Sequence, residues 1–216
     1  MTSGLRERKK QRTREQIAEA ARELFTEHGF DRVTVAQVAR AAEVSEQTVF
    51  NYFATKEDLV YWRLGTFEDE LLATIRDRGA DESVLAAFRR FLLAQGGLLG
   101  RHDADARAQL TAFTRMIVSS PALQAREAQI LEGYTASLAA LIAEETAAPP
   151  GDIRPAAVAN ALMGVHRALI AHTRSRIVAG GLKPSLPRSV RAQAEHAFDL
   201  LEGGLGDYGR RRPPRG

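Results

Sequence analysis

Polar side chains that can bond base edges are concentrated in one short stretch of the sequence. The stretch offers amide and hydroxyl groups with two aromatic rings beside them, and it is almost free of basic residues. A face of this composition is unusual for solvated surface and suits base edges, sugar and phosphate. The candidate DNA-reading face comprises Ser45, Glu46, Gln47, Thr48, Phe50, Asn51 and Tyr52.

Residues that serve catalysis or metal binding form no comparable pattern. The chain has no cysteine, which excludes disulfides, thiol catalysis and cysteine-based zinc sites. Its five histidines include no His-x-x-x-His pair, and neither a nucleophile elbow nor a phosphate-binding glycine loop is present. The run His102–Asp105 only weakly resembles a set of metal ligands, and a loop followed by the start of a helix is the simpler interpretation. We therefore expect no enzyme activity, no metal and no cofactor.

Charge is concentrated at the two ends of the chain, although the net charge is only +3. Basic residues dominate Arg6–Arg14, and a second cluster at Arg210–Arg212 lies in a tail, 207–216, that we expect to be disordered. Basic ends suit a polyanion such as DNA, but a solvated end explains them equally well. No apolar run is long enough to span a membrane and no signal peptide is recognisable, so we expect a cytoplasmic protein with no membrane partner.

The elements that must position the DNA-reading face are short helices with local start and stop signals. Apolar residues at helical spacing predict a helix over Arg12–His28, which Gly29 closes. Thr34 with Gln37 forms a capping box that opens a helix over Val35–Ala42. Ser45 caps the next helix, over Glu46–Tyr52. Helices this short are marginal alone, so a helix-turn-helix clamped on a longer helix is expected.

The remainder of the chain is expected to be helical as well. Thr55 caps a long fourth helix over Lys56–Asp77, which would join the DNA-reading part to the body. Five further helices are expected over Ser83–Leu99, Asp103–Val118, Ala122–Thr146, Ile153–Ala179 and Ser189–Glu202. The fold class is therefore all-α, with about nine helices.

Residues 12–60 resemble, without a gap, the DNA-binding region of the TetR family of regulators. The resemblance is carried by Gly29-Phe30, Thr34–Ala39, Val44–Phe53 and Lys56–Leu59. It implies that the third helix enters the major groove, that Tyr52 and Lys56 contact phosphate, and that Thr34 is a further phosphate contact. Two positions depart from the family pattern, because Glu43 stands at the turn and Gln47 before Thr48, where glycine is usual. A left-handed Glu43 would cost ~1 kcal/mol, whereas Gln47 adds a side chain that can read a base.

The resemblance also implies the domain organisation. It gives a DNA-binding domain at 1–55, a domain for effector binding and dimerisation at 56–206, and the tail at 207–216. Ser120–Leu123 and Ala161–Arg167 resemble an actinobacterial subgroup associated with acyl-CoA-like or similar hydrophobic effectors.

The segment Ile153–Ala179 is apolar on more than one face, which requires burial on two sides. One side can be the chain's own body and the other a symmetric copy, so we expect a homodimer; a central helix in a monomer is the alternative. The expected interface residues are Val158, Leu162, Val165, Leu169, Phe198 and Leu201.

Large apolar and aromatic residues of the body are candidates for a ligand cavity. Plain core is the alternative for each of them, an ion pair for Arg115, and a hydrogen-bonded core histidine for His166. The candidate ligand-pocket residues are Trp62, Phe67, Phe88, Phe91, Phe113, Arg115, Met116, Tyr134, Met163 and His166.

Together these features predict a dimeric regulator that binds a roughly palindromic operator in double-stranded DNA. Repression relieved by a small hydrophobic or amphipathic ligand is favoured over activation. Two other interpretations remain: an architectural DNA binder, and a helical ligand-binding module without control of transcription.

Overall fold

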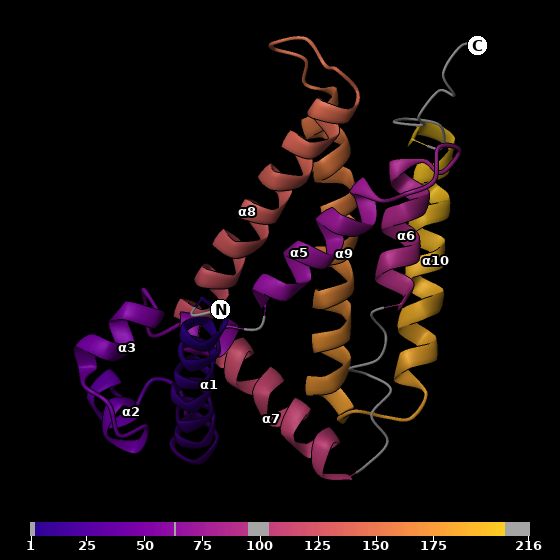
Figure 1. The fold of residues 1–216 in the computed structure, drawn as a ribbon. Helices are drawn as coiled ribbons and strands as arrows, with labels where there is room; N and C mark the ends of the chain where they lie inside the picture. The colour runs from indigo at the N-terminus through magenta and orange to yellow at the C-terminus, as the bar shows by residue number, and fades with distance from the viewer. Residues whose placement is uncertain (1–2, 63, 95–103, 206–216) are drawn as a thin grey trace. The chain divides into compact units, whose positions relative to one another are not determined.

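The computed structural model describes residues 3–62, 64–94 and 104–205, and these residues form helices joined by turns, without a strand among them. The all-α prediction is confirmed. The helices are α1 (Ser3–His28), α2 (Val35–Ala41), α3 (Glu46–Tyr52), α4 (Asp58–Tyr61), α5 (Leu64–Arg76), α6 (Val84–Ala94), α7 (Ala104–Ser119), α8 (Pro121–Glu145), α9 (Arg154–Gly180) and α10 (Leu186–Leu205) (Figure 1).

The described helices form two compact units. One lies within residues 1–65 and 115–127, and the other within 66–114 and 128–216. The first therefore contains α1 to α4 with the corner between α7 and α8. The second contains α5, α6, α9 and α10 with the remaining parts of α7 and α8.

The first unit follows from local signals in the sequence. Gly29, at φ +81°, closes α1 with a hydrogen bond from its N–H to the carbonyl of Phe25. The rings of Phe25 and Phe30 then meet edge to face at 5.1 Å between centroids. The Thr34–Gln37 capping box that opens α2 is present as predicted. The core of the first unit includes the buried residues Ile17, Ala21, Phe25, Val38, Val49, Phe53 and Leu59.

The second unit surrounds a larger apolar core. α10 packs against both α6 and α9, and the rings of Phe88 and Phe198 meet at 6.2 Å between centroids. Arg78, almost fully buried, donates to the carbonyl of Ile75 and forms an ion pair with Glu145. A buried charge requires such partners, so Arg78 fixes the end of α5 beside the end of α8.

Helix boundaries differ most from the expectation in two places. α1 starts at Ser3, well before the expected start at Arg12. The single helix expected over Lys56–Asp77 is instead two, because α4 ends at Tyr61 and α5 begins at Leu64. Gly65, which is about 1 kcal/mol less favourable than alanine inside a helix, weakens a continuous helix at this point. The residues expected to be helical over 95–99 and at 103, and the tail 207–216, lie outside the described residues.

Candidate nucleic-acid interface

The cap of α3 fixes the start of the DNA-reading face. The hydroxyl of Ser45 accepts a hydrogen bond from the backbone N–H of Thr48 at 3.0 Å and lies 2.8 Å from the Thr48 hydroxyl. Ser45 thereby satisfies one of the free N–H groups of the first turn. Both hydroxyls are held in this cap, so they are less free to meet a base than the side chains that follow them.

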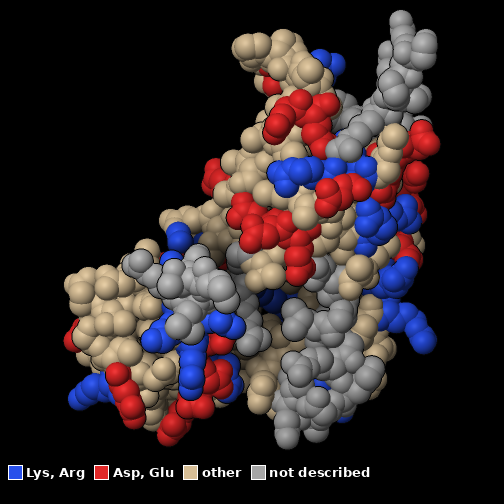
Figure 2. Space-filling view, viewed as in Figure 1, with Lys and Arg blue, Asp and Glu red and all other residues tan. Residues whose placement is uncertain are grey.

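The exposed side of α3 carries the residues that the sequence indicated. Glu46, Gln47, Phe50 and Asn51 are exposed, and Phe50 retains 48% of its surface. Thr48 and Tyr52 are half-buried. Figure 2 shows that the surface over α3 is mostly free of charged side chains in this view. An apolar ring left this open on a helix without basic residues suits contact with a partner better than solvation.

Two amides on this face are joined to each other. The Gln47 Nε2 donates to Asn51 Oδ1 at 3.2 Å, one helical turn away. In this arrangement the side-chain carbonyl oxygen of Gln47 can still accept a hydrogen bond, and the side-chain NH₂ group of Asn51 can still donate one. The pair therefore presents an acceptor and a donor side by side. These complement the N6–H donor and the N7 acceptor that adenine exposes in the major groove.

The turn between α2 and α3 is held against α1. Gln16 of α1 donates to the carbonyl of Ala42 at 2.9 Å, and the Arg14 guanidinium lies 5.6 Å from the centre of the Phe53 ring. Glu43 adopts φ +53°, the left-handed conformation that the sequence left open. The turn thus accepts a strain of ~1 kcal/mol that a glycine would avoid. Gln16 and Arg14 were not singled out from the sequence, because their partners lie far along the chain.

The residues expected at phosphate have different surroundings. Thr34 is exposed, and its hydroxyl is engaged with Gln37 in the capping box. Lys56 is half-buried, with its ammonium 4.1 Å from the centre of the Phe30 ring and 5.9 Å from that of Phe25. Burial lowers the pKa of Lys56 from its ordinary value, and the nearby carboxylates of Asp31 and Glu57 oppose that shift. The rings hold this ammonium in one place beside α4.

The corner between α7 and α8 belongs to the same unit, which sequence reasoning did not foresee. The Tyr61 hydroxyl donates to the carbonyl of Leu123 at 3.0 Å. Arg126 pairs with Asp58 at 2.7 Å, and Ser120 bonds Asp31 at 3.2 Å. Asp58 also accepts the backbone N–H of Thr55 at 3.0 Å. A single carboxylate therefore connects the start of α4 to α8.

Four of the candidate ligand-pocket residues meet in the second unit and form an aromatic cluster. Phe67 lies at its centre, 4.7 Å from the ring of His166, 5.1 Å from Phe91 and 5.9 Å from Tyr134. Burial lowers the pKa of His166 to about 4, with a further contribution from Arg167, so the ring is neutral at pH 7. Its Nδ1 is buried without a hydrogen-bond partner among the described residues. Burial also raises the pKa of Tyr134 to about 12.

The other candidate pocket residues have different surroundings. Phe88 packs on Phe198, Met163 is fully buried, and Phe113 is 39% exposed. Trp62, Arg115 and Met116 belong to the first unit, where Arg115 is exposed. The ring contacts thus bring together Phe67, Phe91, Tyr134 and His166.

The residues expected at a dimer interface are largely buried within the single chain. Val158, Leu162 and Phe198 have almost no exposed surface, and Val165 retains little. Side chains that already pack in their own core offer little surface to a second copy, and the interface assignment stays a prediction. Leu169 and Leu201 are half-buried. The apolar periodicity of α9 corresponds to a stripe of side chains that are buried or half-buried in the single chain.

The side of α9 that faces away from this buried stripe carries small residues. This small-residue side repeats at intervals of three and four positions, with Ala157, Ala168 and Ala171 exposed and Ala161 and Gly164 half-buried. On α10, Leu200 keeps 85% of its surface exposed.

The described part of the chain contains no helix with the length and apolar character that a bilayer crossing requires. Within the same residues, no three or more His, Asp or Glu side chains stand close enough together to hold a metal ion.

Family profiles match most of the chain. Residues 17–61 match the profile described as bacterial regulatory proteins, tetR family, and residues 82–204 match the MftR C-terminal domain. The chain is 34% identical to the transcriptional regulator TcmR of Streptomyces glaucescens, over 70% of this chain and 69% of that protein. It is 28% identical to the putative mycofactocin biosynthesis transcriptional regulator MftR of Mycobacterium tuberculosis, over 92% of this chain and 93% of that protein.

Solved structures share the fold. A TetR-family regulator from Streptomyces coelicolor superposes with a TM-score of 0.56 at 24% identity, covering 91% of this chain and 96% of that one. The regulator FadR of Bacillus subtilis, solved with stearoyl-CoA, gives a TM-score of 0.51 at 24% identity, covering 88% of this chain and 98% of that one.

Proposed function

Because the chain belongs to the TetR family of bacterial regulatory proteins, we propose that it is a homodimeric repressor that binds a palindromic operator through α3. It acts in the cytoplasm, where its DNA lies, and has no catalytic role. The observation that carries the proposal is the capped helix α3, whose exposed face presents Gln47, Phe50 and Asn51. Such a face has no role in the core of its own unit.

The contacts on DNA divide into two kinds. Gln47 and Asn51 read base edges in the major groove, and Phe50 contacts a thymine methyl or a sugar. Tyr52, Lys56 and Thr34 contact phosphate and fix the register of α3. The exposed basic residues of α1, Arg8, Lys9, Lys10 and Arg12, add a contribution that is independent of base sequence.

The second copy of the chain docks on the small-residue side of α9. Alanine and glycine permit close approach of two helix backbones, and Leu200 of α10 adds apolar surface beside them. Two α3 helices must reach half-sites about one helical turn of DNA apart, which a single chain cannot do. A stable dimer of this kind typically buries more than about 1,200 Å² in total.

The effector enters the aromatic cluster. The rings of Phe67, Phe91 and Tyr134 supply apolar contact, and the unpartnered Nδ1 of His166 supplies one hydrogen bond to a polar group of the ligand. The stearoyl-CoA in B. subtilis FadR supports a hydrophobic ligand in a protein of this fold.

Selection from random DNA tests the proposal. The purified chain is incubated with a pool of random duplexes, bound molecules are amplified over several rounds, and the enriched sequences are read. An inverted repeat with half-sites one turn apart supports a dimeric operator-binding protein. Enrichment without any shared sequence would identify an architectural DNA binder instead. Absence of salt-sensitive binding would leave a ligand-binding module.

A further inference from the structure

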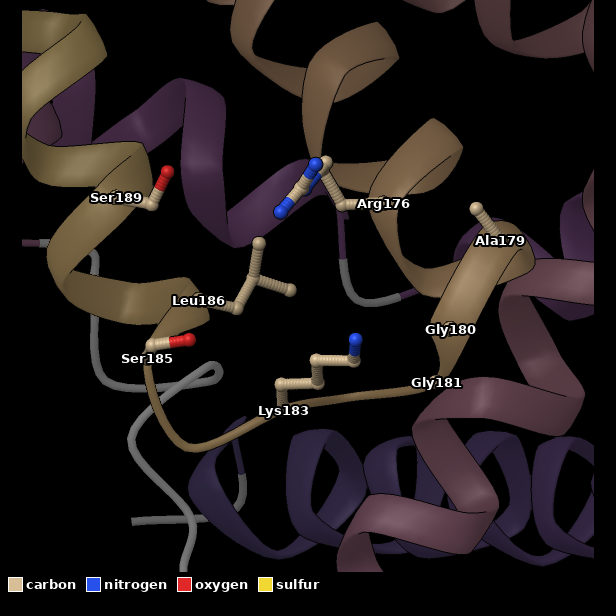
Figure 3. Close-up of a pocket in the computed structure, with 8 residues that line it drawn as sticks. All are labelled: Arg176, Ala179, Gly180, Gly181, Lys183, Ser185, Leu186 and Ser189. Carbon is tan, nitrogen blue, oxygen red and sulfur yellow. The ribbon is translucent and has the colours of Figure 1, made fainter.

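A cavity lies where α9 ends and α10 begins. It has a volume of about 100 Å³ and is lined by Arg176, Ala179, Gly180, Gly181, Lys183, Ser185, Leu186 and Ser189. Figure 3 shows the Arg176 guanidinium and the Lys183 ammonium extending toward the same space between the two helices. At about 30 Å³ for each water in the liquid, the volume equals about three waters, which accommodates a small tetrahedral ion.

Both cations of this α9–α10 cavity lack an acidic partner among the described residues. Neither Arg176 nor Lys183 takes part in an ion pair there. Other arginines of the same chain do pair with carboxylates, namely Arg78, Arg89, Arg90, Arg126, Arg154 and Arg191. Both side chains are exposed, and without a carboxylate beside them their two positive charges make this surface pocket attractive to an anion.

Glycine at the end of α9 leaves room for the end of the Lys183 side chain. A Cβ built on Gly180 would lie 3.0 Å from Cε and 3.3 Å from Nζ of Lys183, so a larger residue would require the flexible end of the lysine to shift by a few tenths of an ångström. Gly181, at φ +70°, then turns the chain and returns its N–H to the carbonyl of Ile177 at 2.7 Å. The Gly-Gly pair therefore folds Lys183 back over the end of α9.

The remaining wall suits a hydrogen-bonded anion. Ser185 and Ser189 bring two hydroxyls from the start of α10, and the buried side chain of Leu186 lies between the cations (Figure 3). The partial charges at the end of α9 and the start of α10 are opposite in sign and about half a unit each, so they largely cancel. Two full positive charges and two hydroxyls remain.

We propose that the α9–α10 cavity binds a phosphate group, either as the free ion or as part of a phosphorylated small molecule. Arg176 bonds two phosphate oxygens through its planar fork, Lys183 neutralises a third, and the serine hydroxyls donate to the rest. The site is distinct from the DNA-reading face and from the aromatic cluster. A bound phosphate ties the end of α9 to the start of α10.

Calorimetric titration with inorganic phosphate tests the site in the full-length protein, with sodium chloride at equal ionic strength as the reference. Adenosine monophosphate and glucose 6-phosphate are titrated in parallel. Saturable heat with phosphate and none with chloride supports the proposal. Tighter binding of one ester than of the free ion identifies a phosphorylated molecule, and equal or weaker binding identifies the ion itself. Equal response to phosphate and chloride would overturn the site.

Variants decide which residues hold the ion. Arg176→Gln and Lys183→Gln should each weaken phosphate binding at least about tenfold, because each removes a charged hydrogen-bond donor. Arg188→Gln removes a nearby exposed cation outside the cavity and should leave the affinity unchanged. Equal losses in Arg188→Gln and Arg176→Gln would show general attraction to positive surface and contradict the proposal.

A second measurement covers the case in which a variant is unstable. In the unaltered chain labelled with ¹⁵N, phosphate should shift the amide resonances of Gly180, Gly181 and Ser185 at the concentration that gives calorimetric saturation. Shifts spread over the basic residues of α1 instead would place phosphate at the DNA-binding end and overturn the assignment.

Discussion

At the residue scale, Gln47 and Asn51 act as one unit because an amide of the first bonds the carbonyl of the second. Gln47→Ala removes a base contact and also releases Asn51. The change should cost ~1–3 kcal/mol on the selected operator and little on random DNA. Fluorescence anisotropy on both duplexes measures the two affinities. Equal losses on operator and random DNA would show that the pair does not specify sequence.

The ammonium of Lys56 is proposed to contact DNA phosphate, and the aliphatic part of its side chain packs on the protein. Lys56→Met keeps apolar contact with the Phe30 ring and removes the ammonium that now lies 4.1 Å from it. Affinity should fall for every DNA sequence, and the slope of log affinity against log salt should decrease by about 1 for each half-site. The melting temperature should change little. An unchanged slope with a lower melting temperature would make Lys56 a packing residue only.

The buried imidazole of His166 makes stability depend on pH. Its folded pKa of about 4 lies below the ordinary 6.5, so on acidification the unfolded chain takes up a proton first. The free energy of unfolding is therefore highest above pH 6.5 and falls between 6.5 and 4. Urea denaturation at several pH values measures the slope. His166→Phe should flatten it, whereas His196→Gln, at an exposed position of α10, should leave it unchanged.

At the scale of elements, the short helices were predictable because their signals are local. Thr34 with Gln37, and Ser45 with Thr48, are each separated by three positions, and Gly29 follows the helix that it closes. The docking of residues 115–127 was not predictable, because Tyr61 and Leu123 are 62 positions apart and no spacing encodes their hydrogen bond. Periodicity likewise found the two faces of α9 without telling which one is buried.

The ion pair between Arg126 and Asp58 is one of the links that this docking provides between α8 and α4. Both side chains are partly shielded from water, so their coupling should exceed that of an exposed pair. A double-mutant cycle with Arg126→Met and Asp58→Asn should give a coupling energy on the order of 1 kcal/mol in the free energy of unfolding. The exposed pair of Arg22 and Glu19 serves as the control and should give less. Equal coupling in both cycles would make the α8 contact dispensable.

At the scale of the whole molecule, operator affinity depends on the dimer, and the small-residue side of α9 allows a test that leaves the core intact. Ala168 is exposed and belongs to this side, whereas Leu162 is buried in the core. Ala168→Glu places a charge where two helices should meet, without removing any apolar contact of the single chain. Sedimentation should then show a monomer, with a circular dichroism spectrum like that of the unaltered protein.

Loss of the dimer should weaken operator binding far more than loss of one base contact. A dimer binds both half-sites in one event, and a monomer must bind each of them independently. Affinity for an isolated half-site should be the same in Ala168→Glu and the unaltered chain, because α3 is unchanged. Ala140→Glu makes the same substitution at an exposed position of α8 and should preserve both dimer and operator affinity. A folded Ala168→Glu dimer with full affinity would place the interface elsewhere, whereas a monomer that retains full affinity would overturn the dimeric mechanism itself.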